Sequence, residues 1–318
     1  MNNNVILEVK HLYKDFRTQG KTIHAVRDVS FEIMEGEIFG IVGESGCGKT
    51  SCGKTSIGLL KKTDGEVRYR GRDIHRMSRK ERYEFSGKVQ MIFQDPYSSL
   101  DPRMKIKDIV TEGIRYHHLA SGKEAESEMV AHLLNMVGLN GEQGNRYPYE
   151  FSGGQRQRIG IARALAVNPE FLLCDEPISA LDVSIQAQIV NLLRRLQRER
   201  NLSMIFIAHD LPMVRYIADR IAVMYLGRIV ELADSEALCG NPLHPYTKAL
   251  ISAVPVPDRN GAHKEITLLE GELPSPTQMY DGCAFADRCP MATESCRTGI
   301  PELEEVEAGH YVACHRCR

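Results

Sequence analysis

The 318-residue sequence contains no apolar run long enough to cross a lipid bilayer. Its first residues, MNNNVILEVK, lack the charged-then-apolar order of a secretory signal peptide. We therefore expect a cytosolic protein that reaches a membrane only through a partner. A formal net charge of −2 gives no electrostatic reason to expect nucleic acid as a ligand. The nine cysteines, without a secretory signal, are expected to be thiols or metal ligands rather than disulfides.

The order of apolar segments predicts an α/β fold with a mostly parallel sheet, because strands alternate with helices. With 42% hydrophobic residues, the chain can bury one large core or two modest ones. After a strand-rich opening, strands are expected at 38–42, 89–93, 171–174 and 204–208, and a strand pair at 220–225 and 228–231 turned at Leu226-Gly227. Helices are expected between about Ile106 and Leu165 and from about Ile185 to Arg200.

The segment GESGCGKT, from Gly43 to Thr50, follows the first of these strands and precedes a helical stretch. That context predicts a phosphate-binding loop, in which backbone N–H groups surround the phosphates. Lys49 would reach the β- and γ-phosphates, and Thr50 would bind Mg²⁺. The loop residues are Gly43, Glu44, Ser45, Gly46, Cys47, Gly48, Lys49, Thr50 and Ser51. Because Cys47 lies within it, we expect thiol reagents to affect the activity.

The same pattern recurs at once, since Gly48 to Thr55 also reads G-x4-G-K-T. Only the first copy follows an apolar strand. The second copy falls where the helix of the loop should run, with Ile57, Leu59 and Leu60 on its apolar side. We therefore assign the first copy and place Lys54 on the helix surface.

Polar side chains follow the other expected strands. Asp175 and Glu176 end the strand at 171–174, where Asp175 can hold Mg²⁺ and Glu176 can orient and deprotonate an attacking water. Pro177 and the following ISALD predict a turn there. His209 ends the strand at 204–208 and is placed to sense a γ-phosphate, and Gln94 can reach both Mg²⁺ and the water. The loop after Gln94, DPYSSLDPR, is expected to be rich in turns.

A second phosphate-binding device is expected at FSGGQRQR, which starts at Phe151. A serine and two glycines lead directly into the helical stretch IGIARAL. A helix N-terminus carries unpaired N–H groups and a positive dipole end, and both favour an anion. Two such devices in one chain suggest a nucleotide held between two surfaces.

Taken in order, GESGCGKT, FQDP, FSGGQRQR, LLCDEP, SALD and AHD resemble the nucleotide-binding subunit of an ATP-binding cassette (ABC) transporter over nearly the whole chain. The resemblance implies a P-loop NTPase fold with a RecA-like sheet, an antiparallel β subdomain and a helical signature subdomain at about 95–165. It also implies a head-to-tail pair of cassettes in which each signature serves the ATP of the other. The signature residues here would be Ser152, Gly153, Gly154 and Gln155, and the D-loop would be Ser179, Ala180, Leu181 and Asp182.

The resemblance further implies an aromatic residue stacked on adenine. Phe16 is our assignment, with Tyr13 as the alternative, and a core position is the competing interpretation. The ATPase domain is expected to span 1–234, followed by an extension at 235–318. Within the extension, NPLHPYTKALISAVPVPD (241–258) resembles the tag of the oligopeptide/dipeptide and related nickel transporters, with a helix opening at HPYT.

The extension contains a cysteine cluster whose spacings of five, six and seventeen intervening residues do not match paired C-x2-C zinc knuckles. Four thiolates can hold either zinc or an iron–sulfur cluster. In the resembled subgroup this pattern binds a [4Fe–4S] cluster, which we favour over Zn²⁺. Cys317 is an alternative ligand. The expected ligands are Cys283, Cys289, Cys296 and Cys314.

Within the subgroup, FSGGQRQR and DEPISALD match the F-type ATPase, which pairs with a different, D-type ATPase. The resemblance thus implies an ATP-hydrolysing subunit at the cytoplasmic face of the cell membrane, working with a D-type subunit, two transmembrane permeases and an extracytoplasmic peptide-binding protein. Di- or oligopeptides are the expected substrates. A nickel or other small-solute importer of the same subgroup, or a soluble non-transport ABC ATPase, is the alternative.

Overall fold

The computed structural model describes residues 4–18, 20–253 and 274–317. The chain forms two compact parts. Residues 34–37 and 76–206 form the first, here called the helical part, and the residues up to 33, 38–75 and from 207 onward form the second, here called the P-loop part. Across the described ranges, no helix combines the length and the apolar character needed to span a membrane.

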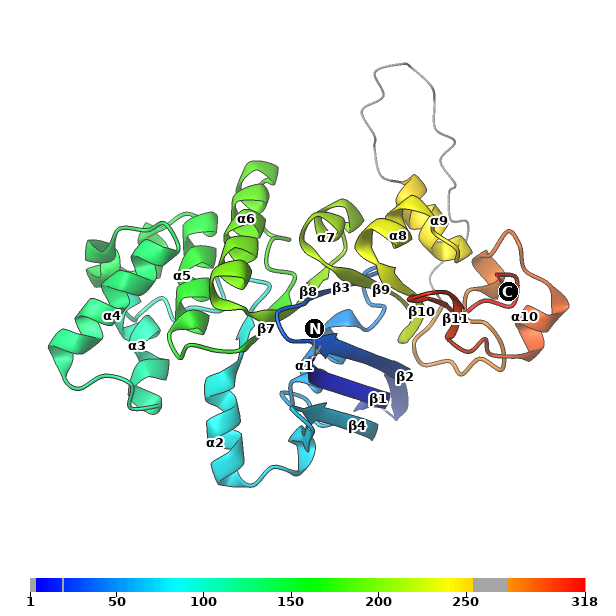
Figure 1. Ribbon diagram of the computed structural model, residues 1–318, viewed down its shortest axis with the longest axis horizontal. Coiled ribbons are helices and arrows are strands. Elements are labelled where there is room, and N and C mark those ends of the chain that lie inside the picture. The colour runs from blue at the N-terminus through cyan, green and yellow to red at the C-terminus, as the bar shows by residue number, and fades with distance from the viewer. Residues whose placement is uncertain (1–3, 19, 254–273, 318) are drawn as a thin grey trace, which may run out of the picture. The chain divides into compact units, whose positions relative to one another are not determined.

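The helical part contains three strands and a group of helices; its segment 76–206 runs from cyan to green in Figure 1. Its strands lie in the order β8-β7-β6, and β6 pairs parallel with β7. Helices α3, α4 and α5 pack against one another. The elements are α2 (Arg79–Lys88), β6 (Val89–Ile92), α3 (Ile106–Tyr116), α4 (Lys123–Met136), the 3₁₀ helices Gly141–Asn145 and Pro148–Glu150, α5 (Gly153–Leu165), β7 (Phe171–Asp175), α6 (Val183–Arg200) and β8 (Ser203–Ala208), whose last two residues belong to the P-loop part.

The sequence pattern explains these elements. Every residue of β7 and of β8 is buried, as expected for parallel strands that are covered on both faces. In α3, the buried residues recur at helical spacing, at Ile106, Ile109, Val110 and Ile114, and therefore form one apolar stripe. Helix α2 has no buried residue; it begins with a capping box between Ser78 and Glu81.

The P-loop part contains two sheets. In the first, ordered β2-β1-β4-β5, β4 pairs antiparallel with both β1 and β5. In the second, the order is β11-β12-β10-β9-β3, where β3 and β9 are parallel and the remaining neighbours are antiparallel. The elements are β1 (Val5–Thr18), β2 (Lys21–Met34), β3 (Ile38–Val42), α1 (Lys49–Ser56), β4 (Asp64–Tyr69), β5 (Arg72–Asp73), the 3₁₀ helix Ile74–Arg76, α7 (Leu211–Ile217), β9 (Arg220–Tyr225), β10 (Arg228–Asp234), α8 (Ser235–Gly240), α9 (Pro245–Ser252), the 3₁₀ helix Ala286–Arg288, α10 (Glu294–Thr298), β11 (Glu304–Glu307) and β12 (His310–Val312).

The predicted α/β fold is confirmed, and so are the expected strands and the helix at HPYT. Two findings refine the sequence analysis. Strands β11 and β12 come from the C-terminal extension, and β12 pairs with β10, so the extension adds two strands to the second sheet. Residues 254–258 of the predicted tag, like all of 254–273, lie outside the described residues.

Helix α1 is shorter than we predicted. It ends at Ser56, so Ile57, Leu59 and Leu60 follow the helix instead of forming its apolar side. The cause is Gly58, whose φ of 72° is left-handed and ends the helical run. Leu59 is 57% exposed. Lys54 lies within α1, so only the first G-x4-G-K-T copy has the strand–loop–helix context of a phosphate-binding loop.

Candidate nucleotide-binding site

The buried strand β3 leads directly into the loop from Gly43 to Lys49, and α1 starts at Lys49. Gly46 and Gly48 have left-handed φ angles of 79° and 104°. At Gly48 a β-carbon would lie 2.0 Å from the carbonyl oxygen of Ala25, so only glycine fits this backbone path. The glycines therefore allow the loop to curve over the N-terminus of α1, where free N–H groups can meet a phosphate.

Lys49 points back across this loop. Its ammonium donates hydrogen bonds to the carbonyl oxygens of Gly43, at 2.8 Å, and Glu44, at 3.0 Å. The side chain is 4% exposed. A lysine held this way keeps its charge within the loop, where a phosphate can replace the carbonyls as its partner.

Glu44 in the same loop has two partners that sequence analysis did not identify. Its backbone N–H donates to the Tyr246 hydroxyl at 2.9 Å. Its carboxylate accepts two hydrogen bonds from Arg288, at 2.8 and 3.0 Å. Arg288 also donates to the Tyr225 hydroxyl at 3.4 Å. The C-terminal extension thus contacts the phosphate-binding loop directly.

The carboxylate strand β7 lies in the helical part and ends at Asp175, which is 1% exposed. The next residue, Glu176, has a left-handed φ of 45°. Its carboxylate accepts a hydrogen bond from the Gln94 amide at 3.0 Å. The structure thus brings together Gln94 and Glu176, two of the residues assigned to Mg²⁺ and water. The predicted turn after Pro177 is also present.

The segment FSGGQRQR begins α5 with a capping box. The Ser152 hydroxyl accepts from the Gln155 N–H at 3.4 Å, and the Gln155 side chain accepts from the Ser152 N–H at 3.0 Å. Ser152 itself is exposed. At Gly154 a β-carbon would lie 2.5 Å from the Ile185 Cγ2 atom, so this glycine allows α5 and α6 to approach closely. The predicted phosphate-binding device is therefore an exposed, capped helix start.

The predicted D-loop lies between β7 and α6. The Ser179 hydroxyl donates to the Glu176 carbonyl at 3.1 Å. The Asp182 carboxylate caps α6 by accepting from the Ile185 N–H at 3.2 Å. This segment also approaches the signature, because a β-carbon at Gly153 would lie 3.5 Å from Leu181.

Helix α5 holds the loop after Gln94. The Arg163 guanidinium donates to the Ser99 carbonyl at 2.6 Å, and the Gln157 amide donates to the Phe93 carbonyl at 3.4 Å. Arg156 lies over the Tyr97 ring, 4.2 Å from its centroid. The loop contains the expected turns and presents the Tyr97 side chain, which is 57% exposed, while Phe93, just before Gln94, is 42% exposed.

Two further predicted residues lie in the P-loop part. Phe16 lies on β1 and is half-buried, with the Lys14 ammonium 4.5 Å from its ring centroid. Tyr13, the alternative, lies on the same strand and is also half-buried. His209 follows the end of β8 and is exposed.

The four predicted cluster ligands lie within range of one another's charge. Burial raises the pKa of Cys283 to about 11, and nearby Cys296, Cys314 and Cys289 add to the rise. Burial also raises the pKa of Cys289, with contributions from Cys314 and Cys296. The donor set is thiol-only, which an iron–sulfur cluster or a four-cysteine zinc site can use. However, no three or more His, Cys, Asp or Glu side chains in the described part of the chain are arranged to hold a metal ion. The geometry therefore does not reproduce the predicted metal site.

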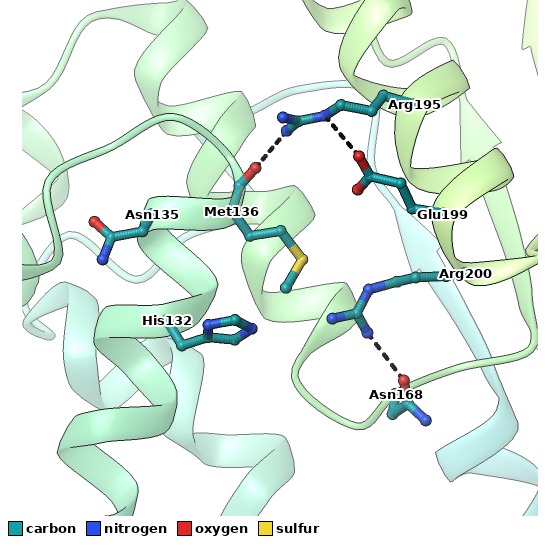
Figure 2. Close-up of a pocket in the computed structure, with 7 residues that line it drawn as sticks. All are labelled: His132, Asn135, Met136, Asn168, Arg195, Glu199 and Arg200. Carbon is teal, nitrogen blue, oxygen red and sulfur yellow. Dashed lines mark hydrogen bonds and ion pairs between the residues drawn. The ribbon is translucent and has the colours of Figure 1, made fainter.

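A cavity of about 690 Å³ lies in the helical part, and none of its lining residues belongs to the predicted nucleotide site (Figure 2). It is lined by α4, α6 and the turn after α5. Arg195 donates to the Met136 carbonyl at 2.6 Å, and Arg200 donates to the Asn168 side chain at 2.9 Å. Both guanidinium groups thus already have protein partners.

Comparison with known proteins decides the family. Residues 26–179 match the family described as ABC transporter, and residues 230–296 match the C-terminal region of oligopeptide/dipeptide transporters. The putative oligopeptide transport ATP-binding protein YkfD of Bacillus subtilis is 54% identical over 98% of this chain and 96% of its own length. The chain belongs to the ABC transporter family. It is an ATPase subunit of that family.

Two other relatives agree with this assignment. The oligopeptide transport ATP-binding protein OppF of Bacillus subtilis is 53% identical over 97% of this chain and 96% of its own length. Among solved structures, the dimeric ATP-binding cassette MJ0796 in a post-hydrolysis state with ADP and phosphate has a TM-score of 0.66. That structure is 28% identical and covers 72% of this chain and 98% of its own.

Proposed function

We propose that this chain is the ATP-hydrolysing subunit of a membrane importer for di- or oligopeptides. The observation that carries the proposal is the presence of both halves of a composite ATP site on one ABC chain. One half is the loop with Lys49, and the other is the exposed capped helix start at Ser152. Full-length similarity to oligopeptide transport ATP-binding proteins supports the peptide substrate.

The roles of the residues follow from phosphoryl-transfer chemistry, in which the protein mainly positions groups and compensates charge. Lys49 and the loop N–H groups bind the phosphates. Glu176 orients and deprotonates the water, and His209 supports hydrolysis. Mg²⁺, when bound, would neutralise phosphate charge, and Thr50, Gln94 and Asp175 are the residues proposed to hold it. Phe16 is proposed to stack on adenine.

We propose that the working unit is a pair of unlike ATPases. Ser152, Gly153, Gly154 and Gln155 would contact ATP bound to a D-type partner, with the D-loop of Ser179, Ala180, Leu181 and Asp182 beside them. The signature FSGGQRQR is the sequence feature that supports this pairing. Closure of the pair on MgATP would move the loop after Gln94. The exposed side chain of Tyr97 in this loop, and that of Phe93 just before Gln94, suit contact with a partner.

In this proposal two permeases and an extracytoplasmic peptide-binding protein complete the importer, and the subunit lies at the cytoplasmic face of the membrane. We place the ATPase domain at 1–234 and the extension at 235–318.

We further propose that Cys283, Cys289, Cys296 and Cys314 hold a [4Fe–4S] cluster, with Zn²⁺ as the alternative. Their thiol-only composition supports this, and iron and acid-labile sulfide analysis of anaerobically purified protein tests it.

Variants of the full-length chain test the ATPase assignment. Glu176→Gln should still bind ATP while turnover stops, because the carboxylate that activates water is lost; full activity would refute the role of Glu176. Lys49→Ala should abolish ATP binding, whereas its matched control Lys54→Ala should not.

The peptide substrate is tested separately. Cells that lack the subunit should lose uptake of labelled oligopeptide while their nickel uptake stays intact.

A further inference from the structure

Glu44 places a carboxylate in the phosphate-binding loop, where it carries the same sign of charge as the ligand. An unpaired carboxylate beside a polyphosphate would weaken binding by Coulomb repulsion. Here the carboxylate instead forms a two-pronged ion pair with Arg288, with distances of 2.8 and 3.0 Å. The Arg288 side chain is 7% exposed and that of Glu44 is 28% exposed, so solvent screens this pair less than a surface pair.

The backbone of the same residue is also held. The Glu44 N–H donates to the Tyr246 hydroxyl at 2.9 Å, and the Glu44 carbonyl accepts from Lys49 at 3.0 Å. Two of the groups that hold Glu44 therefore come from the C-terminal extension, at sequence separations of 202 and 244 residues. They fix both the direction of the side chain and the path of the backbone at this point of the loop.

The partners of Glu44 are themselves rigidly placed. Tyr246, Tyr225 and Phe285 are buried and form a three-ring cluster, with centroids 4.8 to 5.5 Å apart. Arg288 follows three residues after Phe285 and lies over the Tyr225 ring, 5.9 Å from its centroid. Its Nε atom is buried and has no hydrogen-bond partner among the described residues. This unpaired donor offsets part of the stabilisation that the ion pair gives.

We propose that Arg288 and Tyr246 are positioning residues that prepare the P-loop for nucleotide. Arg288 neutralises the Glu44 carboxylate and turns it away from the phosphates, and Tyr246 anchors the loop backbone. The inference rests on the proposed ATP site and deepens it, because it makes the affinity for nucleotide depend on the C-terminal extension.

The test measures ADP affinity by calorimetry on the full-length chain, together with the thermal midpoint without nucleotide. Arg288→Met should weaken ADP binding about tenfold, equivalent to ~1.4 kcal/mol. Adding Glu44→Gln should restore affinity to within about threefold of wild type, because no charge is left to neutralise. Tyr246→Phe should weaken binding about threefold, and Glu44→Gln should not rescue it, since the lost bond is to the backbone.

The matched control is Arg297→Met, which removes an exposed arginine of the same extension that pairs with Asp287 at 2.8 Å; its ADP affinity should not change. A lower thermal midpoint with unchanged ADP affinity in Arg288→Met would overturn the inference. A double variant that binds ADP no better than Arg288→Met would also overturn it.

If Arg288→Met does not fold, the single variant Glu44→Gln decides. Freeing the guanidinium beside the loop should tighten ADP binding about threefold, and unchanged or weaker binding refutes the inference. Wild-type protein that binds no ADP would instead refute the proposed function.

Discussion

Among single residues, Glu176 has the conformation most closely tied to chemistry. Its φ of 45° is left-handed, which costs a non-glycine residue about 1 kcal/mol or more. The conformation is fixed by the Ser179 hydroxyl at its carbonyl and by the Gln94 amide at its carboxylate. Strained backbone of this kind concentrates at functional sites. The strain therefore supports the role proposed for Glu176. The left-handed conformation itself could not be predicted from the sequence.

Cys47 provides a prediction at the same scale. Its position in the loop suggested sensitivity to thiol reagents, but the side chain is 1% exposed and burial raises the pKa of its thiol. Because the thiolate is the reactive form, alkylation in native, nucleotide-free protein should be at least about tenfold slower than in urea. Mass spectrometry of iodoacetamide-treated protein measures both rates. Equal rates would contradict the buried position.

At the scale of elements, buried strands were the easiest to predict. β3, β7 and β8 are continuous apolar runs, and the structure places them where the sequence indicated. Strands β11 and β12 could not be found this way, because β11 reads EEVE, is largely exposed and pairs only with β12. Helix α2 was also missed, since it buries no residue, although Ser78 and Glu81 carry a capping-box signal.

The contact between α5 and α6 gives a prediction for a pair of elements. Gly154→Ala places a β-carbon 2.5 Å from the Ile185 Cγ2 atom, so the Ile185 side chain or the helices must shift. We expect a loss of about 1–3 kcal/mol in the free energy of unfolding, measured with urea. The double variant Gly154→Ala/Ile185→Ala removes the clashing methyl and should lose less than the sum of its single variants. Strict additivity would show that the clash is absent.

The start of α9 gives a prediction about pH. His244 caps this helix by accepting from the Tyr246 N–H at 3.1 Å, and burial lowers its pKa to about 3, with a smaller contribution from Lys248. The unfolded chain takes up a proton near pH 6.5, whereas the folded chain does not until about pH 3. Stability is therefore full above pH 6.5 and falls as the pH drops toward 3, by about 2 kcal/mol at pH 5.

Thermal unfolding of wild type and His244→Asn at pH 7 and pH 5 measures this effect. Asparagine can cap the helix but cannot titrate, so the variant should lack this part of the pH dependence. Glu231 accepts from the His244 N–H at 3.0 Å and is present in both proteins. Its contribution to the pH dependence therefore cancels in the comparison. An identical pH dependence in both proteins would rule out a buried neutral His244.

For the whole molecule, Glu231 joins separate segments of the P-loop part. It lies on β10, is fully buried, and accepts from the N–H groups of Leu243, at 2.8 Å, and His244, at 3.0 Å. His310 on β12 lies 2.7 Å from the same carboxylate. One carboxylate thus ties the extension to the cassette sheet in two places.

Glu231→Ala should therefore destabilise the extension by about 3 kcal/mol or more, because it leaves several buried donors without an acceptor. Amide hydrogen exchange should accelerate in β12 and α9 while β3 stays protected. The control Glu236→Ala removes an exposed acid that pairs with Arg215 on the surface, and its exchange should match wild type. Uniform acceleration over the whole chain would contradict a local role for Glu231.

The motifs of the proposed ATP site could be located in the sequence because each is local: a strand end, a glycine-rich turn or a helix start. The contacts that complete the site could not, since they join residues far apart in the sequence. Gln94 meets Glu176 across 82 positions, and Glu44 meets Arg288 across 244. Neither Arg288 nor Tyr246 has a sequence signal that marks it as a partner of the loop.

That long separation has a consequence for how the protein is made. The ribosome releases the P-loop early, but Tyr246 and Arg288 emerge only after most of the chain has been synthesised, 202 and 244 residues later. Until then Glu44 has neither partner, and its unbalanced charge disfavours nucleotide. If Arg288 and Tyr246 act on the loop as proposed, a nascent cassette should bind nucleotide more weakly until its C-terminal extension has folded.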